Sequence, residues 1–306
     1  SHAELIAHLL YLLDFIDAML DGKRLVFVYT CASLISEILY YLSISRGIPF
    51  LTMNEQRIGY RWSLCANNMD SHEEMLALYR NPEFAITEAG RRRFQNYKEN
   101  LIQRKRNAIE QNYQREHLIR RRLTVRNIFD FVRRSMCNRK VSRYYLAPTR
   151  KQQIAYLTRF KYRERFCRKI FKASLPERPF VYFPLTLIPE ASTLIRGLKH
   201  CDQLGLIKRL SLELPVNWVL LVREHPSAVG NNPVDFYREL GRIFNVSMVS
   251  TDADPMSCIL GAEAVVTVTG TSGMESLALG KKTLVLGSAI YSQLDSVFAV
   301  DEISQV

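Results

Sequence analysis

Two short clusters in the last third of the chain combine residue types that could bind a phosphate. The first is Arg223-Glu224-His225-Pro226, which directly follows the apolar run 217–222. An arginine can make a two-pronged contact with a phosphate, and a histidine can donate a hydrogen bond to one or carry a proton. We expect a phosphate contact here; the alternative is an exposed Arg223–Glu224 ion pair with His225 as an ordinary loop residue.

The second cluster, Thr269-Gly270-Thr271-Ser272-Gly273, lies between a β-branched run at 264–268 and a predicted helix that ends at Gly280. Its hydroxyl groups can cap free amides, and its glycines let a ligand approach the backbone closely. The amino end of a helix also offers N–H groups and a positive dipole to an anion. The cluster matches neither GxxxxGK[ST] nor GxGxxG, so an ordinary helix cap without a ligand is the alternative.

Both clusters follow predicted strands of one α/β domain, which begins after the proline-rich linker 176–179. Strands and helices alternate there, and this pattern predicts a doubly wound parallel sheet. Because ligands bind at the carboxyl ends of such strands, we expect both clusters to face one crevice. The expected strands are 180–183, 217–222, 246–249, 264–268 and 283–286, with one helix reaching about 213 and another at 255–262.

The first part of the chain predicts a further α/β unit. Helix 4–20, strand 25–29, helix 32–46 and strand 48–53 form a β-α-β pattern, so the two strands should be parallel. The second strand leads into residues 54–62, a polar and aromatic stretch that we expect to be a loop, where functional residues often lie. Because the sequence opens without a methionine and soon enters a strand, we expect a fragment of a longer protein.

Residues 91–169 carry 25 of the 42 basic residues and five of the 30 acidic ones. They belong to a stretch, 71–172, that is almost free of glycine and predicts only helices. A segment this basic could lie on nucleic acid, on an anionic membrane or around an acidic substrate. The alternative is a solvated, salt-bridged helical surface, and the spacing of its aromatic residues indicates packing more than base stacking.

Composition limits the remaining possibilities. The mean hydropathy is −0.10, and neither a run of about 18 apolar residues nor a signal peptide is seen, so we expect a cytoplasmic protein. Six cysteines without CxxC spacing or cysteine–histidine clusters predict neither a disulfide framework nor a metal site. We divide the chain into domains at 1–90, 91–175 and 176–306.

Three stretches resemble the capsule polysaccharide biosynthesis glycosyltransferases: YFPLTLIPEAST at 182–193, REHP at 223–226 and VTGTSGMESLALGKKTLVLG at 268–287. The best understood members of that family move 3-deoxy-manno-octulosonic acid (Kdo) from its CMP-activated form. The resemblance covers residues 180–300, and residues 44–61 are similar to the family's amino-terminal half. Bacterial sialyltransferases have similar His-Pro and hydroxyl-rich motifs, which extends the resemblance to users of CMP-sugars. The basic helical segment has no match in the family.

The resemblance implies a GT-B architecture, in which a Rossmann-like domain at 176–306 holds the nucleotide sugar and a truncated one at 1–90 receives the acceptor. His225 would contact the donor phosphate, Thr271 and Ser272 would cradle it, and Glu275 would reach the ribose or a nearby hydroxyl. No cofactor is implied besides the donor substrate. The remaining donor-binding residues that the motifs imply are Pro189, Glu190, Arg223, Glu224, Thr269, Gly270 and Gly273.

Glycosyl transfer needs stabilisation of a departing phosphate and of an oxocarbenium-like centre. Cations and dipoles can supply both, so we expect no metal. A catalytic carboxylate should come from the first domain, and Glu55 is the candidate because it lies beside Arg57 at a predicted strand end; with His225 these form the predicted catalytic set. The alternative is that Glu55 is a surface loop carboxylate.

The partners we expect are a nucleotide sugar, a saccharide or lipid-linked saccharide acceptor, and an anionic membrane surface contacted by residues 91–169, but not nucleic acid. Two other functions fit part of the sequence. A UDP-N-acetylglucosamine 2-epimerase also holds a diphosphate at a helix-opening loop, although this loop lacks the Asp-Ser-Gly-Gly pattern of those enzymes. A non-catalytic protein that binds nucleic acid or a membrane through residues 91–169 would show binding that weakens steeply with salt.

Overall fold

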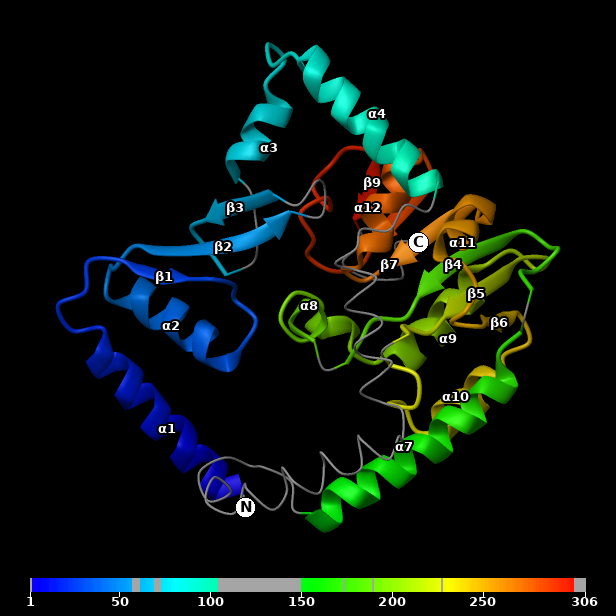
Figure 1. Cartoon of the computed structure of the whole chain (residues 1–306), viewed down its shortest axis with the longest axis horizontal. Helices are drawn as coiled ribbons and strands as arrows, with labels where there is room; N and C mark the ends of the chain where they lie inside the picture. The colour runs from blue at the N-terminus through cyan, green and yellow to red at the C-terminus, as the bar shows by residue number, and fades with distance from the viewer. Residues whose placement is uncertain are drawn as a thin grey trace. The chain divides into compact units, whose positions relative to one another are not determined.

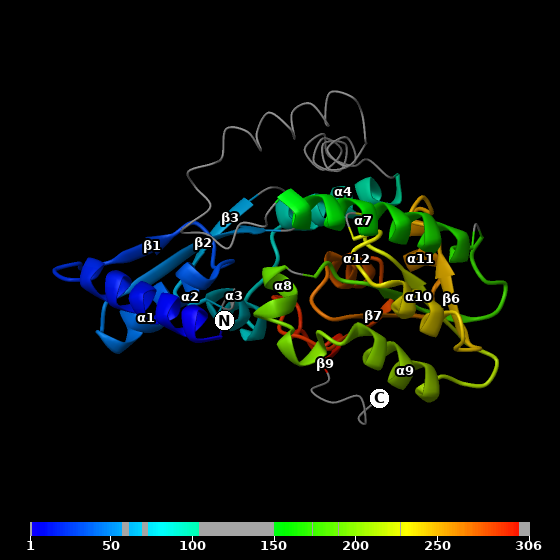
Figure 2. The same cartoon turned by 90° about the horizontal axis from the view of Figure 1, so that it is seen from below.

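The computed structural model describes residues 2–56, 61–68, 73–103, 150–172, 174–188, 190–226 and 228–299, drawn in two views in Figures 1 and 2. Contacts divide the chain into two compact units. Unit 1 comprises Ser1–Glu99, Ile188–Gln203 and Ala264–Val306, and unit 2 comprises Asn100–Leu187 and Leu204–Glu263. The domains predicted at 1–90, 91–175 and 176–306 cut the chain at other points and stay a prediction.

The amino-terminal part of unit 1 is a three-stranded sheet in the order β1-β2-β3. β1 and β2 are parallel, which confirms the predicted β-α-β pattern, and β2 and β3 are antiparallel. The prediction of a loop at 54–62 is wrong, because both ends of this range belong to a β-hairpin. The two strands of the hairpin satisfy each other's backbone hydrogen-bonding groups. The elements are α1 (His2–Met19), β1 (Val26–Val28), α2 (Leu34–Ser45), β2 (Phe50–Gln56) and β3 (Arg61–Cys65).

Helix α2 begins and ends where its sequence predicts. The Ser33 side chain accepts a hydrogen bond from the Ser36 amide, and the Ser36 side chain accepts one from Ser33, so the pair forms a capping box. Gly47 follows the helix at φ 67°, a conformation that favours glycine. The helix packs on a core formed by Leu20, Val26, Cys31 and Phe50, with Leu39, Tyr40 and Leu42 packed against it.

The described part of the basic stretch is helical, as its sequence predicts. It contains α3 (Glu73–Arg80), α4 (Glu88–Ile102) and α7 (Arg150–Ile170), of which α7 belongs to unit 2. Residues 104–149, which make up more than half of the basic segment 91–169, lie outside the described residues. In the part of the chain that is described, no helix is both long and apolar enough to cross a membrane.

The carboxyl-terminal half forms a sheet with the strand order β6-β5-β4-β7-β8-β9. β5 lies parallel to both β4 and β6, and β8 lies parallel to both β7 and β9, so the predicted parallel α/β class is confirmed. All five residues of β5 are buried, as expected where helices cover both faces of a parallel sheet. The strands are β4 (Phe180–Pro184), β5 (Val219–Arg223), β6 (Val246–Val249), β7 (Ala264–Thr267), β8 (Lys282–Val285) and β9 (Val297–Ala299).

Short helices connect these strands. The single helix predicted to reach 213 is wrong: Gly197 precedes a 3-10 turn, and only the stretch after Cys201 continues as a regular helix. This is expected where a glycine interrupts a helical pattern. The connecting helices are α8 (Ala191–Leu194), η2 (Leu198–His200), α9 (Gln203–Glu213), α10 (Val234–Leu240), α11 (Pro255–Gly261) and α12 (Thr271–Ala278).

Candidate functional site

Arg223, the last residue of β5, is directed into the protein. Its side chain is 8% exposed, its Nε donates to the carbonyl of Ala253 at 3.2 Å, and its Nη2 donates to the carbonyl of Thr251 at 2.7 Å. The guanidinium therefore holds the loop that follows β6. The exposed ion pair considered as an alternative is not what the structure has, and a phosphate contact of Arg223 stays a prediction.

Glu224 is fully buried beneath the same strand end. Its Oε2 accepts a hydrogen bond from the Tyr237 hydroxyl at 2.7 Å and one from Asn232 Nδ2 at 3.3 Å, whereas Oε1 has no partner among the described residues. Burial raises the pKa of the Glu224 carboxyl, and the hydrogen bonds from Tyr237, Asn232 and the His225 backbone offset part of that rise. A direct contact between Glu224 and a donor therefore stays a prediction, and the buried carboxyl supports the strand end from within.

His225 is exposed and begins a turn, because its carbonyl accepts a hydrogen bond from the Ala228 amide at 2.8 Å. The loop continues to Gly230 at φ 87°, where an added Cβ would lie 2.9 Å from the carbonyl oxygen of Phe160 on α7. Arg163, also on α7, donates to the carbonyl of Asn231 at 3.0 Å. The loop between β5 and α10 is thus fixed against α7, with His225 at its exposed end.

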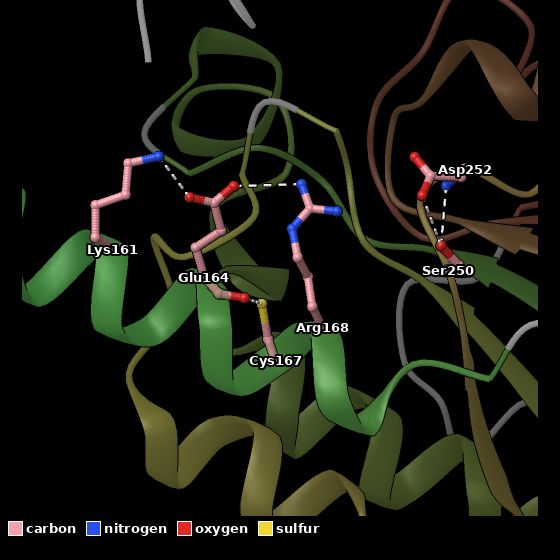
Figure 3. A network of polar contacts seen from close by, with 6 residues as sticks. All are labelled: Lys161, Glu164, Cys167, Arg168, Ser250 and Asp252. Carbon is pink, nitrogen blue, oxygen red and sulfur yellow. Dashed lines mark hydrogen bonds and ion pairs between the residues drawn. The ribbon is translucent and has the colours of Figure 1, made fainter. Parts of the chain in front are cut away.

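Figure 3 shows the polar contacts on the neighbouring part of α7. Glu164 lies between Lys161 Nζ at 2.8 Å and Arg168 Nη2 at 3.2 Å, and its carbonyl accepts a hydrogen bond from Cys167. Burial alone would raise the pKa of Glu164, but the two cations outweigh it and the pKa is lowered. These contacts order the helix surface beneath the His225 loop.

An Asp-x-Asp pair was expected to be absent near the donor site, and this expectation is wrong, because the loop held by Arg223 contains Asp252-Ala253-Asp254. Asp254 is the N-cap of α11 and accepts from the Ser257 amide at 2.7 Å, and the Asp252 amide donates to the Ser250 hydroxyl oxygen at 3.1 Å (Figure 3). Both acidic residues therefore have local structural roles. Among the described residues no group of three or more potential metal ligands is found.

The opening of α12 in unit 1 has the geometry expected of an anion site. Its N-cap is Gly270, and no side chain caps the helix. The first two helical residues, Thr271 and Ser272, make no hydrogen bond through their amides or hydroxyls to other described residues. The Gly270 amide itself donates to Thr267 Oγ1 at 3.0 Å, and an added Cβ at Gly270 would lie 2.8 Å from that oxygen. Two amides at a positive helix end are left for a ligand.

Tyr291 holds this loop from the carboxyl-terminal side and was missed by sequence reasoning. Its buried hydroxyl donates to the Gly270 carbonyl. An added Cβ at Gly273 would lie 2.7 Å from Cζ of the Tyr291 ring, so only glycine fits beneath the ring. The Ser276 hydroxyl donates to the Gly273 carbonyl at 2.8 Å and also bonds with Thr283 Oγ1 at 2.6 Å. A tyrosine in an irregular stretch gives no sequence signal for such a contact.

The other predicted donor residues have varied environments. Thr269 and Glu275 are half-buried near the opening of α12. Glu190 is exposed, and its carbonyl accepts from the amides of Thr193 and Leu194 at the start of α8, whereas Pro189 lies outside the described residues. Residues 223–226 belong to unit 2 and residues 269–275 to unit 1, so their predicted common crevice stays a prediction.

The predicted catalytic pair lies in the β2–β3 hairpin. Glu55 is in β2, opposite Trp62 of β3, rather than in a loop, and Arg57 lies outside the described residues. A second carboxylate of unit 1, Glu37 in the first turn of α2, accepts a hydrogen bond from Asn68 Nδ2 at 2.7 Å. Burial, with a smaller contribution from Glu37, raises the pKa of the Cys31 thiol to about 11. The catalytic role of Glu55 and Arg57 stays a prediction.

Comparison with known protein families gives a match over most of the sequence. The family model described as capsule polysaccharide biosynthesis protein matches residues 85–294. No curated protein is matched. This range includes the 223–226 cluster and the opening of α12. It also includes the basic segment 91–169, so the expectation that this segment has no match in the family is wrong.

Solved structures match the chain only remotely. A Thermosulfurimonas dismutans KpsC, beta Kdo 2,7 transferase, is 17% identical over 50% of this chain and 51% of that chain, with a TM-score of 0.34. The beta Kdo 2,4 transferase of the same organism's KpsC is 12% identical over 94% and 76%, with a TM-score of 0.41. A UDP-GlcNAc 2-epimerase from Neisseria meningitidis, bound to UDP-GlcNAc, is 14% identical over 96% and 68%, with a TM-score of 0.31. The chain spans about half the length of the first of these, and scores this low say nothing about its substrate.

Proposed function

Because the chain belongs to the family of capsule polysaccharide biosynthesis proteins, we propose that it is a glycosyltransferase that builds a bacterial surface polysaccharide. It takes its sugar from a nucleotide-activated donor, a CMP-linked acidic sugar such as CMP-Kdo. The acceptor is a saccharide or a lipid-linked saccharide. A GT-B arrangement of two Rossmann-like domains and a metal-independent reaction are parts of the same proposal.

The observation that carries this proposal is the uncapped opening of α12. Thr271 and Ser272 present amides and hydroxyls without partners among the described residues, directly after a parallel strand. A phosphate bound there would gain charge as the sugar leaves, and donors already in place stabilise that charge without reorganising. An epimerase that holds a diphosphate would use the same feature, so the identity of the nucleotide decides between the two.

We assign the roles as follows. His225 contacts the donor phosphate, Thr271 and Ser272 cradle it, and Glu275 reaches the ribose. Arg223 acts through the loop at 251–253 that it holds by two hydrogen bonds. Glu55 and Arg57 supply the catalytic carboxylate and its cationic neighbour, and the remaining donor contacts come from Pro189, Glu190, Thr269, Gly270 and Gly273. Glu224, which is fully buried, supports the strand end from within.

Thermal unfolding with added nucleotides tests the donor. A nucleotide at about 100 times its dissociation constant stabilises the folded protein by ~2.7 kcal/mol. We expect CMP and CMP-Kdo to raise the melting temperature more than UDP, GDP or ADP at the same concentration. A preference for UDP would support the epimerase in place of the transferase.

The basic residues of 91–169 direct the protein to its acceptor. We assign them to an anionic membrane surface at the inner membrane face, where a lipid-linked saccharide would lie. Each lysine or arginine close to such a surface contributes about 1 kcal/mol of binding. Tight, salt-sensitive binding to RNA with no effect of CMP-sugars would instead favour a non-catalytic nucleic-acid-binding protein.

A further inference from the structure

The residue immediately before His225 is a fully buried carboxylate, which is an unusual neighbour for a residue at an exposed turn. Glu224 is 0% exposed, whereas His225 is exposed. Burying a carboxylate is costly unless hydrogen bonds compensate it. The contacts of Glu224 therefore indicate what it does for the loop above it.

Two groups converge on this carboxylate from the chain that follows it. The Tyr237 hydroxyl on α10 donates to Oε2 at 2.7 Å, and Asn232 Nδ2 donates to the same oxygen at 3.3 Å. Since Tyr237 is itself fully buried, its hydroxyl is a fixed point within the core. The carboxylate joins the start of the His225 loop to its end.

The loop is also held from outside this triad. The Ala228 amide donates to the His225 carbonyl at 2.8 Å, and the Asn231 amide donates to the Ala228 carbonyl at 2.7 Å. Gly230 lies so close to α7 that a Cβ would contact the Phe160 carbonyl. These contacts fix the His225 carbonyl and the middle of the loop, and the Glu224 contacts fix the residue directly before the imidazole.

We propose that Glu224 is a positioning residue: Tyr237 and Asn232 hold its carboxylate, and because it directly precedes His225 it sets the place of the His225 imidazole. This inference rests on the proposed function, in which that imidazole contacts the donor phosphate. Glu224 touches neither the donor nor the reacting atoms. Its effect on transfer passes entirely through His225.

The test uses Tyr237→Phe, Asn232→Ala and Glu224→Gln in the full chain, with Tyr162→Phe and Glu213→Gln as matched controls at exposed positions. The first readout is the NMR resonance and titration midpoint of the His225 imidazole, assigned by its disappearance in His225→Ala. We expect each of the three variants to shift both quantities, whereas the controls leave them unchanged. Glu224→Gln, which keeps the shape, should shift them less than Glu224→Ala.

The second readout is transfer from CMP-Kdo. We expect kcat to fall up to about a hundredfold in Tyr237→Phe, because a displacement on the order of 1 Å costs that much, with a smaller change in KM. An unchanged His225 resonance in folded Tyr237→Phe and Asn232→Ala would overturn the positioning role. If the resonance shifts but His225→Ala transfers at the full rate, the positioning role holds and the proposed role of His225 in transfer fails. Asn232→Ala removes a half-exposed side chain, so it provides a folded variant even if Glu224→Gln unfolds.

Discussion

At the scale of single residues, His225 and Glu224 are adjacent in sequence and opposite in environment. One is exposed at the start of a turn and the other is fully buried in the core. Glu224 directly follows β5, whose residues are all buried, whereas His225 begins the turn that leaves the sheet. A substitution of His225 should therefore change the rate of transfer. A substitution of Glu224 should change both the rate of transfer and the free energy of unfolding.

His225→Ala is expected to lower kcat by about 10² to 10³, the effect of removing one donor that stabilises developing charge. Its melting temperature should stay close to that of the native protein, because surface substitutions change stability by about 0.5 kcal/mol or less. Steady-state transfer kinetics and a thermal melt check the two statements. His8→Ala, at an exposed position of α1, is the control and should leave both unchanged. Full turnover in His225→Ala would remove this residue from the site.

Glu224 makes the free energy of unfolding depend on pH. Its pKa is raised in the folded protein by burial, above its ordinary value of 4.5. A raised carboxyl pKa means that the contribution to stability is complete below that ordinary value and is lost as pH rises through the folded pKa. The groups that face the carboxyl are Tyr237, Asn232, the His225 backbone and, from α7, Cys167.

Glu224→Gln abolishes this titration. We expect its stability relative to the native protein to improve as pH is raised from about 4.5, and to level off once the native carboxyl is ionised. Urea unfolding at a series of pH values measures the difference, with the exposed Glu213→Gln as the control. A difference that does not vary with pH would mean that Glu224 keeps an ordinary pKa in the folded protein.

Sequence identified the exposed residues of the site better than the buried ones. His225, Thr271 and Ser272 follow predicted strands, and the structure gives each the strand end or helix opening expected for it. Arg223 was expected to face a phosphate, yet it binds two loop carbonyls, because the direction of a long side chain depends on neighbours distant in sequence. Tyr291 was missed for the same reason.

At the scale of elements, the opening of α12 depends on a tight contact between a glycine and an aromatic ring. A Cβ at Gly273 would lie within 2.7 Å of Tyr291 Cζ, so Gly273→Ala forces either the ring or the loop to move. Overpacking of this kind costs about 1–3 kcal/mol. We expect that loss in urea unfolding, together with weaker CMP binding because the helix opening is displaced.

A double-mutant cycle identifies the ring as the cause. Gly273→Ala combined with Tyr291→Ala should be destabilised by less than the sum of the two single changes, since the second change removes the clash. Gly280→Ala is the matched control: it has nothing within 4 Å of its added Cβ but lies at φ 74°, so it should be destabilising and additive with Tyr291→Ala. Additive behaviour of Gly273→Ala would contradict the contact.

Helices and strands were predictable where the hydrophobic periodicity and the capping residues agree. They were not predictable where pairing with another strand determines the structure. The β-α-β pattern and α2 are confirmed, because a β-branched strand and a serine capping box are local signals. The paired ends of the β2–β3 hairpin were predicted as a loop, because residues 54–56 and 61–62 are mostly polar and their strand character comes from pairing with each other. Helix α10 and strand β9 are short and carry too few residues for a periodic signal.

At the scale of the whole molecule, charge is distributed unevenly along the chain. The net charge is +12, yet the residues outside 91–169 include 17 basic and 25 acidic ones. The positive surplus therefore resides entirely in the basic segment. Helix α7 is the part of it whose surface is best described: Phe160 and Cys167 face the core, and Arg159, Arg165 and Lys169 are exposed on the opposite side.

This distribution predicts that α7 contributes to binding an anionic bilayer. We expect the triple variant Arg159→Gln, Arg165→Gln, Lys169→Gln to lose about 3 kcal/mol of binding to vesicles that contain phosphatidylglycerol, roughly a hundredfold in partitioning at about 0.1 M salt. The helix itself should persist, because glutamine is nearly as good a helix former as arginine or lysine. Sedimentation with vesicles and circular dichroism check the two statements.

The matched control removes the same charge elsewhere, at the exposed residues Lys199, Arg209 and Arg242. If net charge alone attracts the protein to the bilayer, both triple variants should bind equally weakly, and the assignment to α7 fails. If α7 lies on the membrane, the control should bind nearly as well as the native protein, since charges beyond about 10 Å from the lipid are screened at 0.1 M salt. Equal partitioning of the native protein onto neutral and anionic vesicles at low salt would contradict its association with an anionic membrane. Stabilisation of the folded protein by CMP would still report on the donor site in that case.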